Sequence, residues 1–354
     1  FFEEDLKRPM EEFVQRLGIV TFQEKLGTTL QKVGRMERLA KAVAQAAGED
    51  EQGVSNAVRA AHLAKADLVS QAVVEFTSQQ GVMGGYYAGA AIREHYRPRF
   101  AGDELPSGTC GKCVAIADKL DTACGIFAID EPPTGSSDPY AVRRAAIGII
   151  AMLRTMPSVH LKDLIALALS SYAEQGLEFD AAAVQADVEK FFLGRLAAIA
   201  REEGVAPDAI EAVSSVGVID PAEFLARAEA LDAARSEQPE LFDDLATAYA
   251  RAHNLADASL GCEVDAALLG ESERALLSAC EQGEQKVVAC VEASDFAGAC
   301  SALAELREPI DRFFEDVLVM DEDTRVRENR LRLLNRFASV FADVANIGAL
   351  SRKK

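Results

Sequence analysis

The 354-residue sequence contains no tryptophan, only 6% aromatic residues and four histidines. No apolar run reaches the length of a membrane-spanning helix, so the sequence gives no reason to expect a membrane partner. Long alternations of Val, Ile and Thr, which are typical of half-buried strands, are also absent. Because alanine is abundant and 49% of the residues are apolar, the composition predicts an all-α globular protein with very little sheet.

The sequence begins Phe1-Phe2-Glu3, without a methionine, a signal peptide or a basic leader. We therefore expect a C-terminal fragment of a longer cytoplasmic protein. Its seven cysteines, an odd number, predict reduced thiols. Cys110 and Cys113 form the only C-x-x-C pair, and no second Cys or His pair follows at zinc-site spacing, so we expect no metal.

The formal net charge of −20 is unevenly distributed along the chain. Residues 1–154 hold 18 Lys and Arg against 20 Asp and Glu, residues 155–304 hold 9 against 27, and residues 305–354 hold 10 against 10. A polyanion is repelled by the acidic middle but not by the two ends. The charge pattern therefore indicates which parts would face a nucleic acid, and it does not exclude binding.

Breaks at glycine and proline divide the chain into three expected helical domains, residues 1–155, 156–236 and 237–354. Asp295 and Asp323 are suited to cap helices. A loop is expected over the glycine-rich residues 81–85. Apolar residues at helical spacing predict helices over these ranges: 6–27, 30–47, 54–79, 240–257, 271–292, 295–319 and 324–346.

The most informative stretch runs from Asp118 to Leu153. A helix carrying Asp118 and Asp121 leads into a Pro/Gly loop over 132–137, after which we expect Asp138 to cap a second helix with Pro139 at its first position. Apolar residues then recur at helical spacing, which predicts a buried stripe: Val142, Ala145, Ala146, Ile149, Ile150 and Leu153. Arg143 and Arg144 fall just beside this stripe.

This stretch resembles the signature of the β subunit of bacterial two-subunit glycyl-tRNA synthetase. Further matching strings occur in the same order along the whole chain: Phe22 to Gly27, Lys65 to Leu68, Gln80 to Gly84, Glu94 to Pro98, Phe192 to Arg195, Ile310 to Met320 and Arg327 to Leu331. The resemblance implies an HD-like helical domain, then a helical linker region, then an α-helical anticodon-binding domain. It also implies that a large N-terminal region is missing.

HD phosphohydrolases hold a metal through histidines and aspartates, and the metal activates water. Here Ala66 precedes Asp67, so the histidine of the His-Asp pair is absent, and Asp118 or Asp121 would stand for the closing aspartate. We therefore expect a degenerate HD domain without a metal site. Lys65 or Asp67 would then pair with acidic or basic groups of the 118–121 segment across the core.

Two basic features are candidates for tRNA contacts. Arg143 and Arg144, beside the loop over 132–137, could hold a phosphate at a helix N-terminus, or instead pair with acids such as Asp138. On the helix after Asp323, these residues project opposite the apolar face, either toward RNA or simply into solvent: Arg325, Asn329, Arg332 and Arg336.

Two arginines of the matching strings and one histidine are expected to stabilise the fold rather than to bind a ligand. Arg327 and Arg330 fall on the packed side of the last helix, so we expect a partly buried ion-pair cluster with acids of the preceding helix. The expected partners are Asp311, Glu315 and Asp316. His95 is expected to be buried and hydrogen-bonded.

The resemblance implies that this chain is a noncatalytic part of a glycyl-tRNA synthetase and that it binds glycine tRNA. The α subunit of an α2β2 heterotetramer would attach glycine using ATP with magnesium, and no cofactor or DNA partner is expected for this chain. Two alternatives remain. A metal-dependent HD phosphohydrolase would need Asp67 and Asp118, and a structural module would contact the α subunit without binding RNA.

Overall fold

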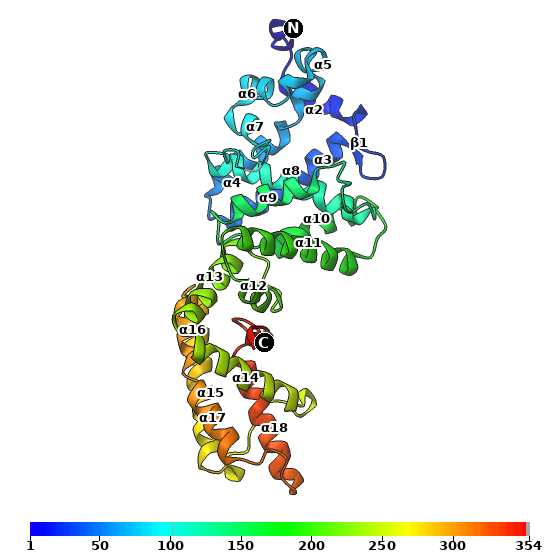
Figure 1. Ribbon diagram of the computed structural model, residues 1–354. Coiled ribbons are helices and arrows are strands. Elements are labelled where there is room, and N and C mark those ends of the chain that lie inside the picture. Colours follow the sequence, from blue (N-terminus) through cyan, green and yellow to red (C-terminus); the bar gives the residue numbers. More distant parts are fainter. Residues whose placement is uncertain (101, 352–354) are drawn as a thin grey trace. The chain divides into compact units, whose positions relative to one another are not determined.

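The computed structural model describes residues 1–100 and 102–351 as two compact units (Figure 1). Unit 1 comprises Phe1–Arg195 with Ile219–Ala222, and unit 2 comprises Leu196–Val218 with the chain from Glu223 onward. The expected all-α class is confirmed, because the strands of the described chain are limited to β1 (Thr21–Gln23) and β2 (Gly27–Thr28). The division into three domains at residues 155 and 236 stays a prediction.

Unit 1 is built from short and medium helices around one long one. Its elements are α1 (Phe2–Asp5), α2 (Met10–Arg16), η1 (Leu17–Ile19), α3 (Thr29–Ala46), α4 (Glu51–Leu63), η2 (Ala66–Val69), α5 (Gln71–Glu75), η3 (Thr77–Gln79), α6 (Val82–Ala88), α7 (Ala90–Glu94), α8 (Thr109–Ala128), α9 (Val142–Leu153), α10 (Leu161–Glu174) and the first part of α11 (Ala181–Glu202).

Helix α8 forms the centre of unit 1, where it contacts α3, α4, α7, α9 and α10 (Figure 1). Small residues such as Ala115, Ala117 and Ala123 let these neighbours approach, and each of the three is fully buried. A helix that is covered on nearly all sides must pair any charged group that it carries. Asp118 and Asp121 lie on this helix, which makes their partners the main question of the site.

Two expected helices of unit 1 are interrupted. The 6–27 segment ends its helix at Arg16 and forms the β1–β2 hairpin, where Gly27 adopts a φ of +93° that suits glycine. The 54–79 segment breaks after Leu63. Ser70 accepts a hydrogen bond from the Val73 amide and so starts α5, because a capping side chain stabilises a new helix start.

Two expected boundaries near the glycine-rich segments were also wrong. Most of the 81–85 loop is the first turn of α6, with only Gly81 (φ +79°) outside the helix. Helix α9 begins at Val142 rather than at Pro139. The Ala141 amide closes a turn onto the Asp138 carbonyl, and Ala141 itself lies at a φ of +53°, so the helix cannot continue back to Pro139.

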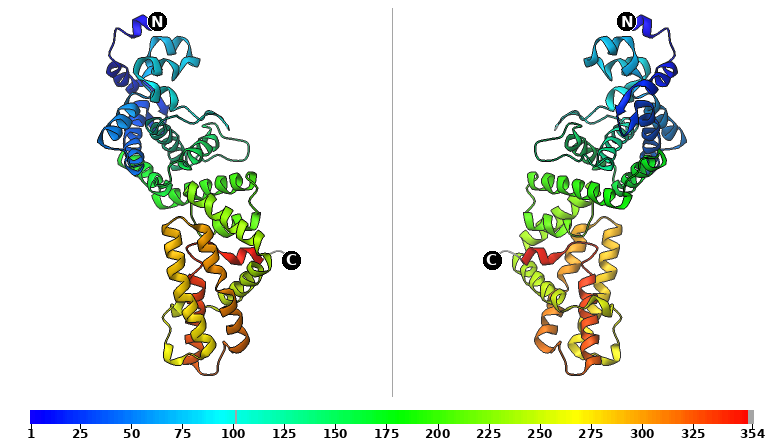
Figure 2. Two further views of the ribbon diagram at one scale, coloured as in Figure 1. Left: turned by 90° about the vertical axis from the view of Figure 1, so that its left-hand side faces the viewer. Right: turned by 90° about the vertical axis from the view of Figure 1, so that its right-hand side faces the viewer.

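Unit 2 packs long helices around an aromatic core that includes Phe242, Phe313 and Phe337, all fully buried or nearly so. In both views of Figure 2, α15 and α18 lie side by side, as their contacts require. The elements of unit 2 are the last part of α11, α12 (Pro207–Ser214), α13 (Pro221–Glu237), α14 (Pro239–Leu255), η4 (Ala258–Leu260), η5 (Ala266–Leu268), α15 (Glu271–Glu292), α16 (Phe296–Ala304), α17 (Arg307–Asp316), α18 (Thr324–Ser339) and η6 (Ile347–Ser351).

The predicted helices over 240–257 and 271–292 match α14 and α15 closely. The 295–319 segment is instead two helices. Pro309 cannot donate to a carbonyl one turn earlier, and α17 places it in its first turn, where no donor is needed. Asp295 and Asp323 both cap helices as expected. Among the described residues, no helix is both long and apolar enough to cross a membrane.

His62 on α4 bonds to side chains of α2 and α3, and these contacts make the stability of unit 1 depend on pH. His62 Nδ1 lies 2.7 Å from Glu37 and Nε2 lies 2.8 Å from Glu11. Burial would lower the pKa of His62, but the two carboxylates outweigh burial and raise it above 6.5. The protonated form is therefore preferred in the folded state, and both ring nitrogens then donate.

We expect thermal unfolding of unit 1 to show this linkage. The contribution of His62 is fully present below about pH 6.5, the pKa of the unfolded chain, and is lost as pH rises through the raised folded pKa. His62→Gln should flatten the decline in melting temperature between pH 6 and 8. His253→Gln, an exposed position in unit 2, is the control; an unchanged slope in His62→Gln would contradict the assignment.

Candidate functional site

Asp118 lies between two lysines near the centre of unit 1. Lys65 Nζ donates to Asp118 Oδ2 at 2.7 Å, and Lys32 Nζ lies 3.1 Å from Oδ1. Burial would raise the pKa of Asp118, but the attraction of Lys65 and Lys32 outweighs it and holds the pKa well below its usual range. The expected pairing of Lys65 with the 118–121 segment is thus confirmed.

Asp67 does not join this cluster of charges. Its Oδ2 accepts hydrogen bonds from the amides of Gly81 (2.7 Å) and Gly84 (3.0 Å), so it organises the start of α6. A Cβ atom at Gly84 would lie 2.8 Å from Ile92 and 3.0 Å from this carboxylate, which explains the glycine. Burial raises the pKa of Asp67.

Asp121 is fully buried and belongs to a second network. Its Oδ1 accepts from Arg35 Nε at 2.7 Å, and its Oδ2 accepts from Lys32 Nζ and from Arg35 Nη2 at 3.1 Å each. The Tyr172 hydroxyl also donates to Oδ2 at 3.1 Å. This carboxylate therefore joins α3, α8 and α10 inside the core.

The sequence reasoning missed Lys32 and Arg35, although a signal was present. Both are at most 4% exposed. They fall within the apolar stripe of α3 at intervals of three and four residues, with these buried neighbours: Val33, Met36, Leu39, Ala40 and Val43. A charged side chain inside such a stripe needs a buried partner of opposite charge. Asp121, on another predicted helix, could have been proposed as the partner of Lys32 and Arg35.

His95 is fully buried beside Lys65, as expected from the sequence. Its Nδ1 bonds the Ile92 carbonyl, and its Nε2 lies 3.0 Å from Lys65 Nζ. Burial, reinforced by the positive charge of Lys65, lowers the pKa of His95 well below its usual value. The ring is therefore neutral, with Nδ1–H donating to Ile92 and Nε2 accepting from Lys65.

The donor set of these residues does not fit a catalytic divalent cation. Within the described part of the chain, no group of three or more His, Cys, Asp or Glu side chains could hold a metal ion. Asp67, Asp118 and Asp121 are directed to backbone amides, lysines and an arginine respectively. The lysine and arginine side chains that pair with Asp118 and Asp121 would repel a divalent cation.

The start of α9 places Arg143 and Arg144 differently from the sequence expectation. Asp138 does cap the helix, with Oδ1 and Oδ2 accepting from the Val142 and Arg143 amides at 2.8 and 3.0 Å. These amides are therefore already satisfied by a carboxylate. Neither arginine side chain forms an ion pair with Asp138, and Arg144 is exposed to solvent. The expected buried stripe of α9 is confirmed, except that Ala145 is only half-buried.

The loop over 132–137 is closed on itself. The Thr134 and Ser137 amides each donate to the carbonyl of the other, at 3.0 and 2.7 Å. This pairing leaves fewer backbone donors for a phosphate than an open loop would offer. The RNA-contact hypothesis for this loop stays a prediction, and it depends on Arg143 and Arg144 rather than on the loop amides.

The four candidate residues of α18 have different surroundings. Arg325 is exposed near the helix start, and its backbone amide donates to the Asp323 cap at 2.9 Å. Asn329 is 1% exposed. Its side chain accepts from the Asp265 amide at 2.7 Å and donates to the Asp265 carbonyl at 3.0 Å. Asn329 therefore does not project into solvent, because it anchors the segment before α15.

Arg332 and Arg336 are half-buried and engaged within unit 2. Arg332 Nε donates to the Leu260 carbonyl at 3.2 Å, and its Nη2 lies 3.7 Å from Glu328. Arg336 makes a bidentate bond to Glu284, with both distances at 2.9 Å. An RNA phosphate would have to displace these partners. Of the four candidates, Arg325 is the most accessible.

Arg330 is a structural residue, as the sequence predicted, but with other partners. Arg330 Nε donates to Glu273 at 2.6 Å, and its Nη1 donates to Asp321 at 2.7 Å. Arg327 donates to the Asp321 carbonyl at 2.9 Å. The expected partners on α17 were wrong, because the turn after α17 and the start of α15 supply nearer acids.

Two parts of the chain match known protein families. Residues 245–348, which include most of α14 and all of α15 to α18, match the DALR anticodon binding domain. Residues 1–215 match the family described as glycyl-tRNA synthetase beta subunit. Since this second match covers more than half of the chain, the chain belongs to the glycyl-tRNA synthetase beta subunit family.

Similar proteins named glycine–tRNA ligase beta subunit occur in several bacteria. The chain is 36% identical to the protein of Desulforapulum autotrophicum, 40% identical to that of Aliivibrio fischeri and 38% identical to that of Haemophilus influenzae. Each match includes 99% of this chain and 52% of the relative. The chain therefore spans about half the length of these relatives.

Proposed function

We propose that this chain is the tRNA-recognition part of a glycine–tRNA ligase beta subunit. The observation that carries the proposal is the anticodon-binding match over residues 245–348, within a chain that resembles beta subunits over 99% of its length. Unit 2 would bind the anticodon region, and unit 1 would support another part of the tRNA.

The wider proposal concerns the complete enzyme. Glycine would be activated with ATP and magnesium on a separate α subunit in an α2β2 assembly in the cytoplasm, and this chain would be noncatalytic. The arrangement of unit 1 supports a binding role, since Asp118 and Asp121 are committed to Lys32, Lys65 and Arg35. Both carboxylates accept from cationic side chains, which makes them weak general bases.

Arg325 is the residue on which the proposal is most directly tested. Removing one phosphate-binding charge weakens electrostatic binding to all sequences and lowers the salt slope by about 1. We expect Arg325→Gln to weaken glycine tRNA binding three- to tenfold at low salt, a range on the order of one charge-assisted contact. The measurement is a dissociation constant across a potassium chloride series.

Lys286→Gln is a matched control with the same loss of charge. Lys286 lies on α15 in the acidic segment and pairs with Glu305 at 2.5 Å. Binding should change less than twofold in this variant. Equal losses in Arg325→Gln and Lys286→Gln would contradict a local contact. Binding of the α subunit with no measurable tRNA affinity would favour the structural-module alternative.

A further inference from the structure

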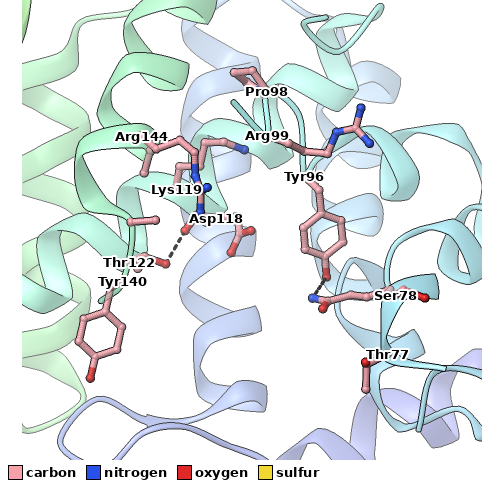
Figure 3. Close-up of a pocket in the computed structure, with 13 residues that line it drawn as sticks. Thr77, Ser78, Tyr96, Pro98, Arg99, Asp118, Lys119, Thr122, Tyr140 and Arg144 are labelled. Atoms are coloured by element: carbon pink, nitrogen blue, oxygen red, sulfur yellow. Dashed lines mark hydrogen bonds between the residues drawn. The ribbon is translucent and has the colours of Figure 1, made fainter. Parts of the chain in front are cut away.

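A cavity of about 590 Å³ opens in unit 1 beside the Asp118 cluster (Figure 3). Arg144, Lys119 and Asp118 line one side, and Tyr96 lines the other, with the exposed residues Thr77 and Ser78 beyond it. A volume of this size accommodates a small organic ligand. The comparisons with known proteins assign no ligand to this cavity.

The cavity has an excess of positive charge that the protein does not neutralise. Asp118 is its one lining carboxylate, and Lys65 and Lys32 already balance that charge from behind. Among the described residues, neither Lys119 nor Arg144 has a carboxylate within ion-pair distance. An anion in the cavity would therefore meet two cations that are not in direct ion pairs, although Asp118 partly offsets the charge of Lys119.

Lys119 is held in position to receive such an anion. Its Nζ donates to the His95 carbonyl at 3.0 Å and to the Arg97 carbonyl at 2.8 Å. An ammonium group has three N–H bonds, so one remains for a ligand. Because two carbonyls fix the ammonium, little side-chain freedom is lost when a ligand binds.

Electrostatics around Lys119 agree with this geometry. Burial lowers the pKa of Lys119 to about 8; the nearby Asp118 carboxylate opposes this shift, whereas repulsion from Lys65, Lys32 and Arg144 adds to the effect of burial. A bound anion would offset that repulsion and raise the pKa again. The titration of Lys119 therefore reports on occupancy of the cavity.

We infer that this cavity binds the phosphate group of a nucleotide between Arg144 and Lys119. The planar guanidinium of Arg144 suits bidentate contact with phosphate oxygens, and the Lys119 ammonium supplies a point charge. The source of the phosphate is either a free mononucleotide or a nucleotide unit of an RNA chain. This site does not depend on anticodon recognition by unit 2.

Calorimetric titration of the full chain tests the inference with three probes: inorganic phosphate, AMP and adenosine. We expect saturable binding of phosphate and AMP at one site and none of adenosine. Arg144→Gln should weaken both by about tenfold, and Arg144→Lys should recover part of the loss, as for a charge-assisted contact. Lys162→Gln, a charge-matched change at an exposed position of α10, should alter neither.

A second measurement separates binding in the cavity from binding elsewhere. Lysine side-chain NMR should show the pKa of Lys119 rising when phosphate saturates the chain, and a clearly smaller rise in Arg144→Gln at the same phosphate concentration. Adenosine binding as tightly as AMP, an equal loss in Lys162→Gln, or an unchanged Lys119 titration would each overturn the site.

A short single-stranded RNA identifies the source of the phosphate. Tighter binding of the RNA than of AMP, with the same dependence on Arg144, would support an RNA chain as the natural ligand. AMP binding as tightly as the RNA and displacing it would support a free nucleotide. RNA binding that does not change in Arg144→Gln and is not displaced by AMP would overturn an RNA phosphate in this cavity.

Discussion

Asp121→Ala is expected to destabilise unit 1 by about 3–5 kcal/mol, the cost of leaving buried charges without their partner. Arg35 would keep only neutral acceptors, the Gln175 side chain, the Tyr172 hydroxyl and the Leu26 carbonyl. Lys32 would keep Asp118 but lose its 3.1 Å contact with Asp121. Since a domain of this size is stable by about 5–15 kcal/mol, this loss would be easily measured.

Denaturant unfolding of the full chain, followed by a probe in unit 1, provides the measurement. Glu174→Gln is the control, because it removes an ion pair with Arg38 on the surface of the same unit, where both side chains are exposed. Adding Arg35→Gln to Asp121→Ala should recover part of the stability, since the charge of Arg35, which Asp121→Ala leaves without a carboxylate, is then removed as well. A loss below about 1 kcal/mol would show that the Asp121 network is not buried as described.

Arg330→Ala is expected to cost unit 2 about 3 kcal/mol, the lower end of the range for breaking a buried pair. Glu273 is 3% exposed and would keep only the Gly270 amide as a partner. Arg330 also donates to the Leu318 carbonyl at 2.8 Å, so the turn before α18 would lose a contact. The change is expected in the midpoint of denaturant unfolding of unit 2.

Arg325→Ala on the same helix is the matched comparison. Arg325 is exposed, so its loss should leave stability nearly unchanged while it weakens tRNA binding. Arg330→Ala should weaken tRNA binding only in proportion to the fraction of the protein that it unfolds. If Arg330→Ala left stability intact and abolished binding, Arg330 would be a tRNA contact and our structural interpretation would be wrong.

The sequence predicted the helical class well, because periodicity and caps are local properties. Helix α15 shows this most clearly, since the predicted range of 271–292 agrees with Glu271–Glu292 in the structure. Helix α9 shows the limit. Asp138 caps it across a turn that includes a left-handed Ala141, and nothing in the spacing distinguishes that arrangement from a helix beginning at Pro139.

The sequence predicted the site only in part. The sequence predicted that Lys65 or Asp67 would pair with the 118–121 segment, and it left open that Lys65 and Asp118 would be the pair. The partners of Arg330 could not be predicted, because they depend on how the turn after α17 folds back. Asn329 was assigned to an open face because a polar residue opposite an apolar stripe usually faces solvent, whereas here a connecting segment covers it.

The central claim is that this chain recognises glycine tRNA through its anticodon-binding domain. Its most direct test is the affinity of the full chain for glycine tRNA, for the same tRNA with a changed anticodon, and for an unrelated tRNA, each across one salt series. We predict clearly tighter binding of the cognate anticodon, with a salt slope that reflects phosphate contacts. Equal and weak binding of all three tRNAs would contradict the claim.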